Sequence, residues 1–325
     1  MVNFRKIQQT GGKERSSFSI VLPKEWVTQQ KLKKGQSVVV VEREDGCLIV
    51  DPRMSNVGET RSTSVKIQPN LRWQITSRYL LGFDEIRVTG ERSITDDQRT
   101  ELEQIINRFV SLEIVEENDK EIVLRCLVDP SRYTVRKVML QMNRIASRMV
   151  TDAMTAYFEG SKEAAQEIIK RDERVDRLFF LIVRELRSAI QYPRLSEAMK
   201  ITPVESLDFR LAAQYIERIA DLAVDIAQRV GPEIDKTLTK KLQPIVERVV
   251  EMLAKSVNNL FDFGSENVSS VIESERELIT ETAKLRQLII SSRDGEPQTQ
   301  LYVVDSLLRM GEAARDIADL ALPLN

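Results

Sequence analysis

The sequence predicts a multidomain chain with three different folds. These are a small N-terminal β domain, a small α/β domain in the middle, and an all-α C-terminal part built from two tandem three-helix bundles. Short alternating strand patterns fill residues 1–53, strands and helices mix over 54–130, and helical periodicity continues over 131–325. With 325 residues, 42% of them hydrophobic, the chain is long enough for several cores.

The first segment, 1–53, combines very short strands with a strong excess of positive charge. Strand patterns occur at 4–8, 17–22, 37–42 and 47–50, and a short helix begins at Pro23. Asp45-Gly46 is a typical hairpin turn. A segment of about fifty residues with four short strands can scarcely bury a hydrophobic core by itself. We therefore expect a partner chain. Residues 1–40 carry a net charge of +6 and the remainder carries −8, which indicates that this end meets a polyanion.

Three stretches of this segment, RKIQQTGG, SFSIVLPKEWV and LKKGQSVVVVEREDGCLIVDP, resemble the SpoVT/AbrB family of swapped-hairpin DNA-binding domains. The resemblance covers nearly all of 1–53 and implies an intertwined homodimer that lays a basic surface on DNA. Matched residue by residue, the DNA-binding positions are Arg5, Lys6, Lys13, Arg15 and Lys24. Such cations suit phosphate contacts, which provide affinity but little sequence discrimination. A solvated basic face on a module that only dimerises is the alternative.

The middle segment, 54–130, predicts a connecting α/β domain with element order βαβαββ. Strand patterns VKIQP and EIRVTG flank the helical NLRWQITSRYLLG. A capped helix follows from Thr95, before the strand patterns SLEIVEE and EIVLRCLV. The segment holds no motif that we connect to chemistry, and we expect Trp73 in its core.

From residue 131 onward, the pattern predicts six long helices arranged as a repeat. DERVDRLFFLI is echoed by ERELITETAKL, and IERIADLAVDIA by LLRMGEAARDIA. We therefore predict one three-helix unit over 131–232 and a second over 233–325, packed as two antiparallel bundles.

The third helix, within 201–231, has the clearest ends and an unusual charge pattern. Thr202-Pro203-Val204-Glu205 is a capping box, and Gly231-Pro232 ends the helix. We expect a core-facing stripe made of Val204, Leu207, Leu211, Tyr215, Ile219, Leu222, Ile226 and Val230. Glu217 and Asp221 lie beside it, one turn apart, with Asp225 another turn on. Because like charges at this spacing repel, a cation or basic partner is expected nearby.

This repeat, with DERVD in its second helix and IERIADLAVDIA in its third, resembles the PhoU family of phosphate-signalling regulators over most of 131–325. The family's Glu/Asp-x-x-x-Asp motifs bind clusters of metal ions. They map onto Asp172 with Asp176 and onto Glu217 with Asp221. The resemblance thus implies a site for iron(III) or another hard cation such as Mg²⁺, Mn²⁺ or Ca²⁺, since all ligands are oxygens.

The alternative to a metal site is a solvent-exposed carboxylate face whose charge is balanced by Arg174, Arg177 and Arg218.

The second repeat departs from the metal motif. Glu275 and Glu312 match Asp172 and Asp221, but Ile279 and Leu308 replace the other two carboxylates. Glu275 with Glu312 is therefore a weak second half-site at best.

Composition excludes several classes of function. The chain has no His, which excludes His-based catalytic triads, imidazole zinc sites and the Glu-x-x-His di-iron pattern. Two cysteines, Cys47 and Cys126, form no disulfide framework, and no GxxxxGK[ST] phosphate loop occurs. The polar start MVNFRKIQQ and the lack of a membrane-length apolar run predict a cytoplasmic protein without membrane insertion.

Together these features predict a non-enzymatic, homodimeric transcription regulator of phosphate uptake and homeostasis. Its helical part would sense phosphate status through a metal, an anion or a transporter partner. The PhoU resemblance implies contact with the ATPase subunit of a phosphate ABC transporter. Two alternatives stay open. One is an accessory protein that negatively modulates that transporter, with an N-terminal segment that only dimerises; the other is a carboxylate-bridged metalloenzyme.

Overall fold

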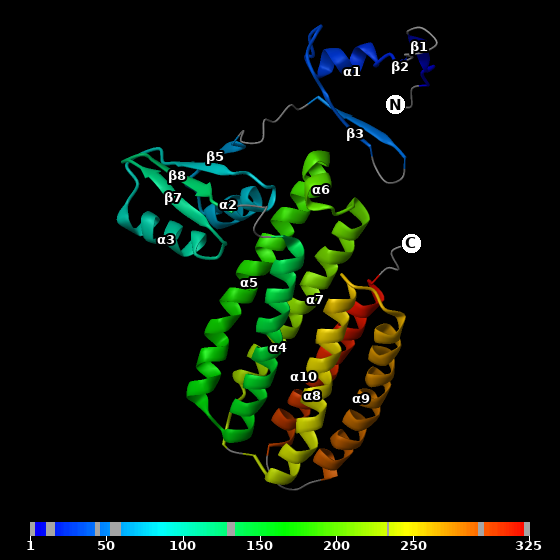
Figure 1. Ribbon diagram of the computed structural model, residues 1–325. Coiled ribbons are helices and arrows are strands. Elements are labelled where there is room, and N and C mark those ends of the chain that lie inside the picture. Colours follow the sequence, from blue (N-terminus) through cyan, green and yellow to red (C-terminus); the bar gives the residue numbers. More distant parts are fainter. Residues whose placement is uncertain are drawn as a thin grey trace. The chain divides into compact units, whose positions relative to one another are not determined.

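The computed structural model describes residues 4–10, 17–42, 46–52, 60–128, 134–232, 234–291 and 296–321 (Figure 1). The chain divides into two compact units between residues 59 and 60. Together they have the three-part organisation that the sequence predicts: small antiparallel strands, then a small mixed sheet, then long helices.

The N-terminal unit consists of two separate hairpins and one short helix. Its elements are β1 (Gln8–Thr10), β2 (Ser17–Ser19), α1 (Lys24–Gln29), β3 (Val39–Glu42) and β4 (Leu48–Asp51). The antiparallel pairing of β3 with β4 confirms the predicted hairpin, although Asp45 itself lies outside the described residues. The first strand was predicted at 4–8 and this is wrong. Strand pairing begins at Gln8, opposite Ser19, because the partner strand decides where a strand forms.

This unit has almost no core of its own. Among its described residues only Val39 and Asp51 are buried. Large apolar side chains that are more than half exposed are Phe4, Ile7, Phe18, Ile20, Val21, Val40 and Leu48. So much uncovered apolar surface is costly in water, since each such side chain gains about 1.5–3 kcal/mol on burial.

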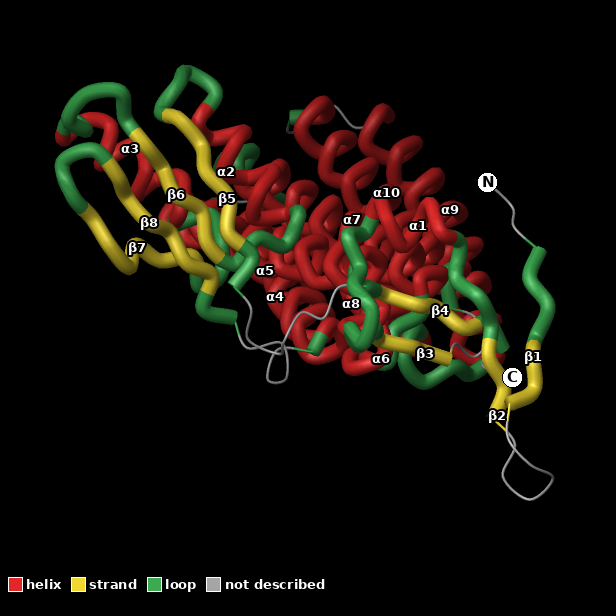
Figure 2. The backbone as a smooth tube through the Cα atoms, turned by 90° about the horizontal axis from the view of Figure 1, so that it is seen from above, coloured by secondary structure: helices red, strands yellow, loops and turns green. Residues whose placement is uncertain are grey.

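The middle part is an α/β unit in the predicted order. Its elements are β5 (Ser62–Lys66), α2 (Leu71–Leu80), β6 (Glu85–Thr89), α3 (Asp96–Ile106), β7 (Leu112–Glu117) and β8 (Glu121–Cys126). The sheet has the order β5-β6-β8-β7, in which only β5 and β6 run parallel (Figure 2).

The core of this unit lies between the sheet and helices α2 and α3. Trp73 was expected in it, but this is wrong, because its side chain is 65% exposed. The buried residues of α2 are Leu71, Ile75 and Tyr79, spaced four apart. Trp73 is two residues away from Leu71 and therefore lies on the opposite side of the helix.

Over the described residues from 134 to 321, the chain forms the six predicted long helices and one short helix, α6, that was not predicted. Their bounds are α4 (Val135–Glu159), α5 (Lys162–Gln191), α6 (Pro193–Met199), α7 (Pro203–Ala227), α8 (Lys236–Asn259), α9 (Ser265–Ser291) and α10 (Pro297–Asp319). Helices α4, α5 and α7 form one group and α8, α9 and α10 a second beside it (Figure 1). One continuous apolar cluster runs through both groups.

Helix α7 begins as predicted, with reciprocal hydrogen bonds between Thr202 and Glu205 that complete the capping box. Its predicted stripe is only partly correct. Val204, Leu207 and Leu211 are 58%, 66% and 42% exposed, whereas the later positions are mostly buried. In the first turns the helix instead buries a different face, made of Ser206, Phe209, Ala212 and Ala213.

Within the part of the chain that the structure describes, no helix combines the length and the apolar character needed to cross a membrane.

Candidate metal centre

The structure brings the four predicted carboxylates of the first repeat into one cluster, which we call the carboxylate cluster. Asp172 and Asp176 lie one turn apart on α5, and Glu217 and Asp221 one turn apart on the neighbouring α7. The charge of Asp172 interacts with Asp176 and Asp221, and that of Glu217 with all three other members. All four side chains are partly buried.

Burial and mutual repulsion make these carboxyl groups hard to ionise. Burial, followed by the neighbouring carboxylates, raises the pKa of Asp172 to about 7 and that of Glu217 to about 7. Burial also raises the pKa of Asp176 and of Asp221. At neutral pH, Asp172 and Glu217 are therefore only partly ionised.

The hydrogen bonds of the cluster leave room for a ligand. Oδ1 of Asp172 is buried and has no hydrogen-bond partner. Glu217 accepts a 2.5 Å hydrogen bond from Nε2 of Gln214 through Oε2. These oxygens suit a hard cation. Across the described residues, however, no three Asp, Glu or Cys side chains already surround one point closely enough to hold a metal ion. Binding would thus require some of the four side chains to turn inward.

The three arginines that were expected to balance the cluster do so weakly. Arg177 donates from Nη2 to the backbone oxygen of Phe109 at 3.2 Å and does not shift the pKa of any of the four carboxyl groups. Arg218 lowers the pKa of Asp221, but less than burial raises it. Arg174 is exposed.

The weak second half-site is blocked by a cation of the chain itself. Nε of Arg315 lies 3.6 Å from Oε2 of Glu275, and Glu312 is exposed. Arg315 stands at the position that Val224 occupies in the first repeat. A guanidinium thus takes the place of a metal ion beside Glu275, in addition to the loss of the carboxylates at Ile279 and Leu308.

The predicted DNA-binding residues of the N-terminal unit are surface residues where the structure describes them. Arg5 and Lys6 precede β1, Lys24 is the first residue of α1, and all three are exposed. Lys13 and Arg15 lie outside the described residues.

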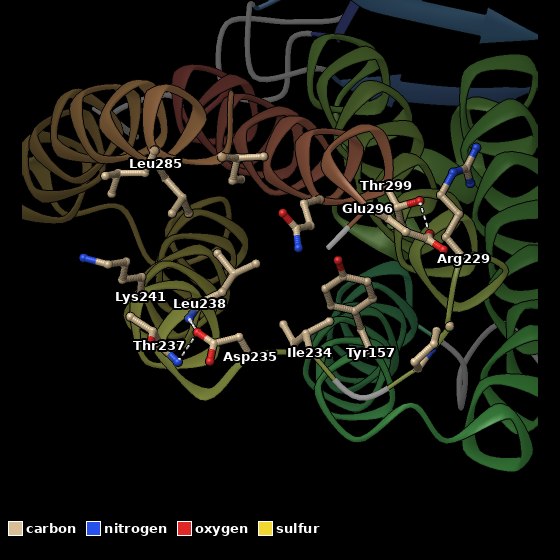
Figure 3. Close-up of a pocket in the computed structure, with 15 residues that line it drawn as sticks. Tyr157, Arg229, Ile234, Asp235, Thr237, Leu238, Lys241, Leu285, Glu296 and Thr299 are labelled. Carbon is tan, nitrogen blue, oxygen red and sulfur yellow. Dashed lines mark hydrogen bonds between the residues drawn. The ribbon is translucent and has the colours of Figure 1, made fainter. Parts of the chain in front are cut away.

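Sequence reasoning missed a cavity of about 500 Å³ at the end of the bundles where α8 and α10 begin (Figure 3). Tyr157 points into it, and burial followed by the Glu296 carboxylate raises the pKa of this phenol to about 12. The lining contains two basic residues, Arg229 and Lys241, and two acidic residues, Asp235 and Glu296, so it has no net charge. Its residues come from separate helices and share no motif that a sequence could reveal.

Comparisons with known proteins identify two domains in this chain. A family model described as PhoU domain matches residues 139–230, and one described as antidote-toxin recognition MazE, bacterial antitoxin, matches residues 15–57. By these matches, the chain joins a helical region similar to the PhoU domain to an N-terminal region similar to the MazE/AbrB type. Both predicted resemblances are confirmed.

A solved structure of a PhoU protein shares the helical fold. The phosphate transport system regulatory protein PhoU from Streptococcus pneumoniae is 18% identical with a TM-score of 0.50, covering 57% of this chain and 91% of that one. PhoU from Pseudomonas aeruginosa is 20% identical with a TM-score of 0.49, covering 57% of this chain and 93% of that one. No curated protein sequence matches the chain.

Proposed function

We propose that this protein is a cytoplasmic, DNA-binding regulator of phosphate uptake that catalyses no reaction. The observation that carries this proposal is the union, in one chain, of a PhoU domain with a basic MazE/AbrB-type domain. The solved structure from Streptococcus pneumoniae belongs to a phosphate transport system regulatory protein, which supports phosphate uptake as the regulated process. We also propose contact with the ATPase subunit of a phosphate ABC transporter.

The N-terminal unit is proposed to act as a homodimer on DNA. Its uncovered apolar side chains and nearly absent core support pairing with a second copy. A two-fold dimer would present two sets of the cations Arg5, Lys6, Lys13, Arg15 and Lys24 to the phosphate backbone.

The carboxylate cluster is proposed to bind a hard cation. The unpartnered oxygen of Asp172 and the raised pKa values of Asp172 and Glu217 support this role, because a cation would supply the missing positive charge. Iron(III), Mg²⁺, Mn²⁺ and Ca²⁺ all prefer oxygen ligands. Bound cation would then report phosphate status to the DNA-binding part through a coupling between the two sites.

The test of DNA regulation is to incubate the purified protein with sheared DNA from its own source at moderate salt and to sequence the retained fragments. We expect enrichment near phosphate-transport genes. The double variant Arg5→Glu, Lys6→Glu should lose it, while the control Lys236→Glu, Lys240→Glu, which reverses two exposed charges on α8, should keep it.

Retention without enrichment, or none in any of the three proteins, would contradict the proposal. The function would then shift to the alternative, an accessory protein that negatively modulates the transporter while its N-terminal unit only dimerises.

A further inference from the structure

One turn of the α/β unit packs against α5 beside the carboxylate cluster. This turn, 107–111, follows α3. Its Phe109 is 1% exposed, and the ring lies 5.4 Å from the ring of Phe180 on α5. Arg177 Nη2 donates to the backbone oxygen of Phe109 at 3.2 Å. Phe180 is one helical turn beyond Asp176, so the α/β unit reaches the edge of the cluster.

The turn places one cation, Arg108, at this edge. Its Cζ lies 5.3 Å from the centroid of the Phe180 ring, a distance at which a guanidinium and an aromatic face attract each other. Arg108 also interacts electrostatically with Asp176 and lowers the pKa of that carboxyl, against the larger effect of burial. It exerts no comparable effect on Asp172 or Glu217, whose pKa values rise to about 7.

The position of this turn is held by a buried anchor elsewhere in the same interface. Arg184 of α5, 4% exposed, donates from Nη1 to the backbone oxygens of Tyr79 at 2.9 Å and Phe83 at 2.7 Å. Its Nη2 lies 2.8 Å from Oδ1 of Asp84. These bonds tie the end of α2 to α5. Arg108 is therefore presented to the cluster by a docked domain rather than by a free loop.

We propose that Arg108 is a built-in counter-cation of the carboxylate cluster, so that docking of the α/β unit and binding of a divalent cation at the cluster oppose each other. The inference rests on the proposed cation site. A guanidinium beside Asp176 already neutralises part of the charge that would attract a metal ion, and it repels that ion. In the second repeat a cation of the chain also lies beside a carboxylate, because Arg315 pairs with Glu275, although from a different helix position.

This opposition couples cation binding at the cluster to the docking of the α/β unit. If docked Arg108 lowers the affinity of the cluster for a cation, then by thermodynamic reciprocity a bound cation must lower the docking equilibrium constant of Arg108 by the same factor. Cation binding would thus loosen the turn 107–111 from α5. The α/β unit directly follows the N-terminal domain in the sequence, so the change reaches the segment that adjoins the proposed DNA-binding part.

The test measures Mn²⁺ binding to the full-length protein by titration calorimetry at pH 7.5, in wild type, Arg108→Ala and Arg108→Lys. Removal of the charge should tighten Mn²⁺ binding about tenfold, a typical size for coupled sites. Arg108→Lys keeps the charge and should stay near wild type. The control Arg72→Ala removes a neighbouring charge of the α/β unit that affects none of the four carboxylates, and should leave the affinity unchanged.

The outcomes separate the two proposals. An Asp172→Ala variant shows whether Mn²⁺ binds at the cluster. If it loses the binding that wild type has, and Arg108→Ala binds Mn²⁺ equally or more weakly than wild type, the counter-cation role is wrong while the cation site stands. Binding in Arg108→Ala but not in wild type supports the role most strongly. Absence of binding in every protein overturns both. As a second readout, saturating Mn²⁺ should speed hydrogen exchange of the Phe109 amide, and unchanged exchange would count against the inference.

Discussion

At the scale of single residues, the raised pKa values of Asp172 and Glu217 make the stability of the cation-free protein depend on pH. Both folded-state values are about 7, above the unfolded values of about 4. The folded state therefore binds more protons than the unfolded state between these limits. The resulting stabilisation is complete below about pH 4 and is lost as pH rises through about 7. In EDTA, the urea midpoint should be lower at pH 8 than at pH 5.5.

The double variant Asp172→Asn, Glu217→Gln checks this origin, because it removes both ionisations and should flatten the pH dependence. The control Glu273→Gln alters an exposed carboxylate of α9 and should leave the dependence in place. Carboxyl groups with lowered pKa, such as Glu251, change charge below the pH range of the measurement. A midpoint that rises from pH 5.5 to 8 would contradict the assignment.

A second residue, Arg184, should carry much of the attachment of the α/β unit to α5. Arg184→Ala removes the Nη1 bonds to the backbone oxygens of Tyr79 and Phe83 and the Nη2 bond to Asp84, which keeps its bonds from Arg61. Hydrogen bonds to a charged group contribute about 1.5–3 kcal/mol each. We expect a lower urea midpoint and faster proteolysis within 60–128. Arg187→Ala, at an exposed position on the same helix, should change stability by less than about 0.5 kcal/mol. Equal stability of the two variants would remove Arg184 from this role.

At the scale of elements, α7 separates what periodicity can predict from what it cannot. Its start at Thr202 was predicted from the capping box, which depends only on local sequence. The face that its first turns bury was predicted wrongly, because α7 is apolar on more than one side and packs against α4, α5 and α10 together. Alanines at 212 and 213 allow these helices to approach closely, and Leu207 is left outside.

One exposed and one buried position of α7 test this assignment of its faces. Leu207→Gln should change the free energy of unfolding by less than about 0.5 kcal/mol, because the side chain is 66% exposed. Ile216→Ala, at a fully buried position of the same helix, should cost about 2–5 kcal/mol. Urea unfolding followed by the helical circular dichroism signal measures both. A large loss in Leu207→Gln would mean that a partner covers this side in solution.

At the carboxylate cluster, too, local sequence patterns predict residues on one helix but not the contacts between distant segments. Asp172, Asp176, Glu217 and Asp221 were predicted as metal ligands from one-turn spacing and family resemblance, because both depend on local sequence. Arg108 could not be found in this manner. It follows α3 in a segment without a motif, and only the packing of Phe109 on Phe180 brings it to the cluster.

At the scale of the whole molecule, the nearly coreless N-terminal unit should make the chain a dimer. Ile20 and Leu48 are 57% and 66% exposed, and we expect a second copy to cover them. Ile20→Asp with Leu48→Asp in the full-length chain should convert the dimer to a monomer in analytical ultracentrifugation. The helical circular dichroism signal should persist, because α4 to α10 have their own core. A double variant that sediments as a dimer would place dimerisation elsewhere.

Dimerisation and DNA affinity should respond to different residues, which allows the two roles of the N-terminal unit to be separated. Arg5→Ala with Lys6→Ala should keep the dimer but remove up to two phosphate interactions from each copy. Because each neutralised phosphate releases a counterion, the slope of log affinity against log salt should become shallower by about 0.9 for each phosphate that the variant no longer neutralises. Fluorescence anisotropy with two duplexes of different sequence, from about 50 to 300 mM salt, measures the slope. An unchanged slope in a variant that remains dimeric would exclude these two cations from the DNA interface, whereas a change confined to one duplex sequence would indicate base recognition instead.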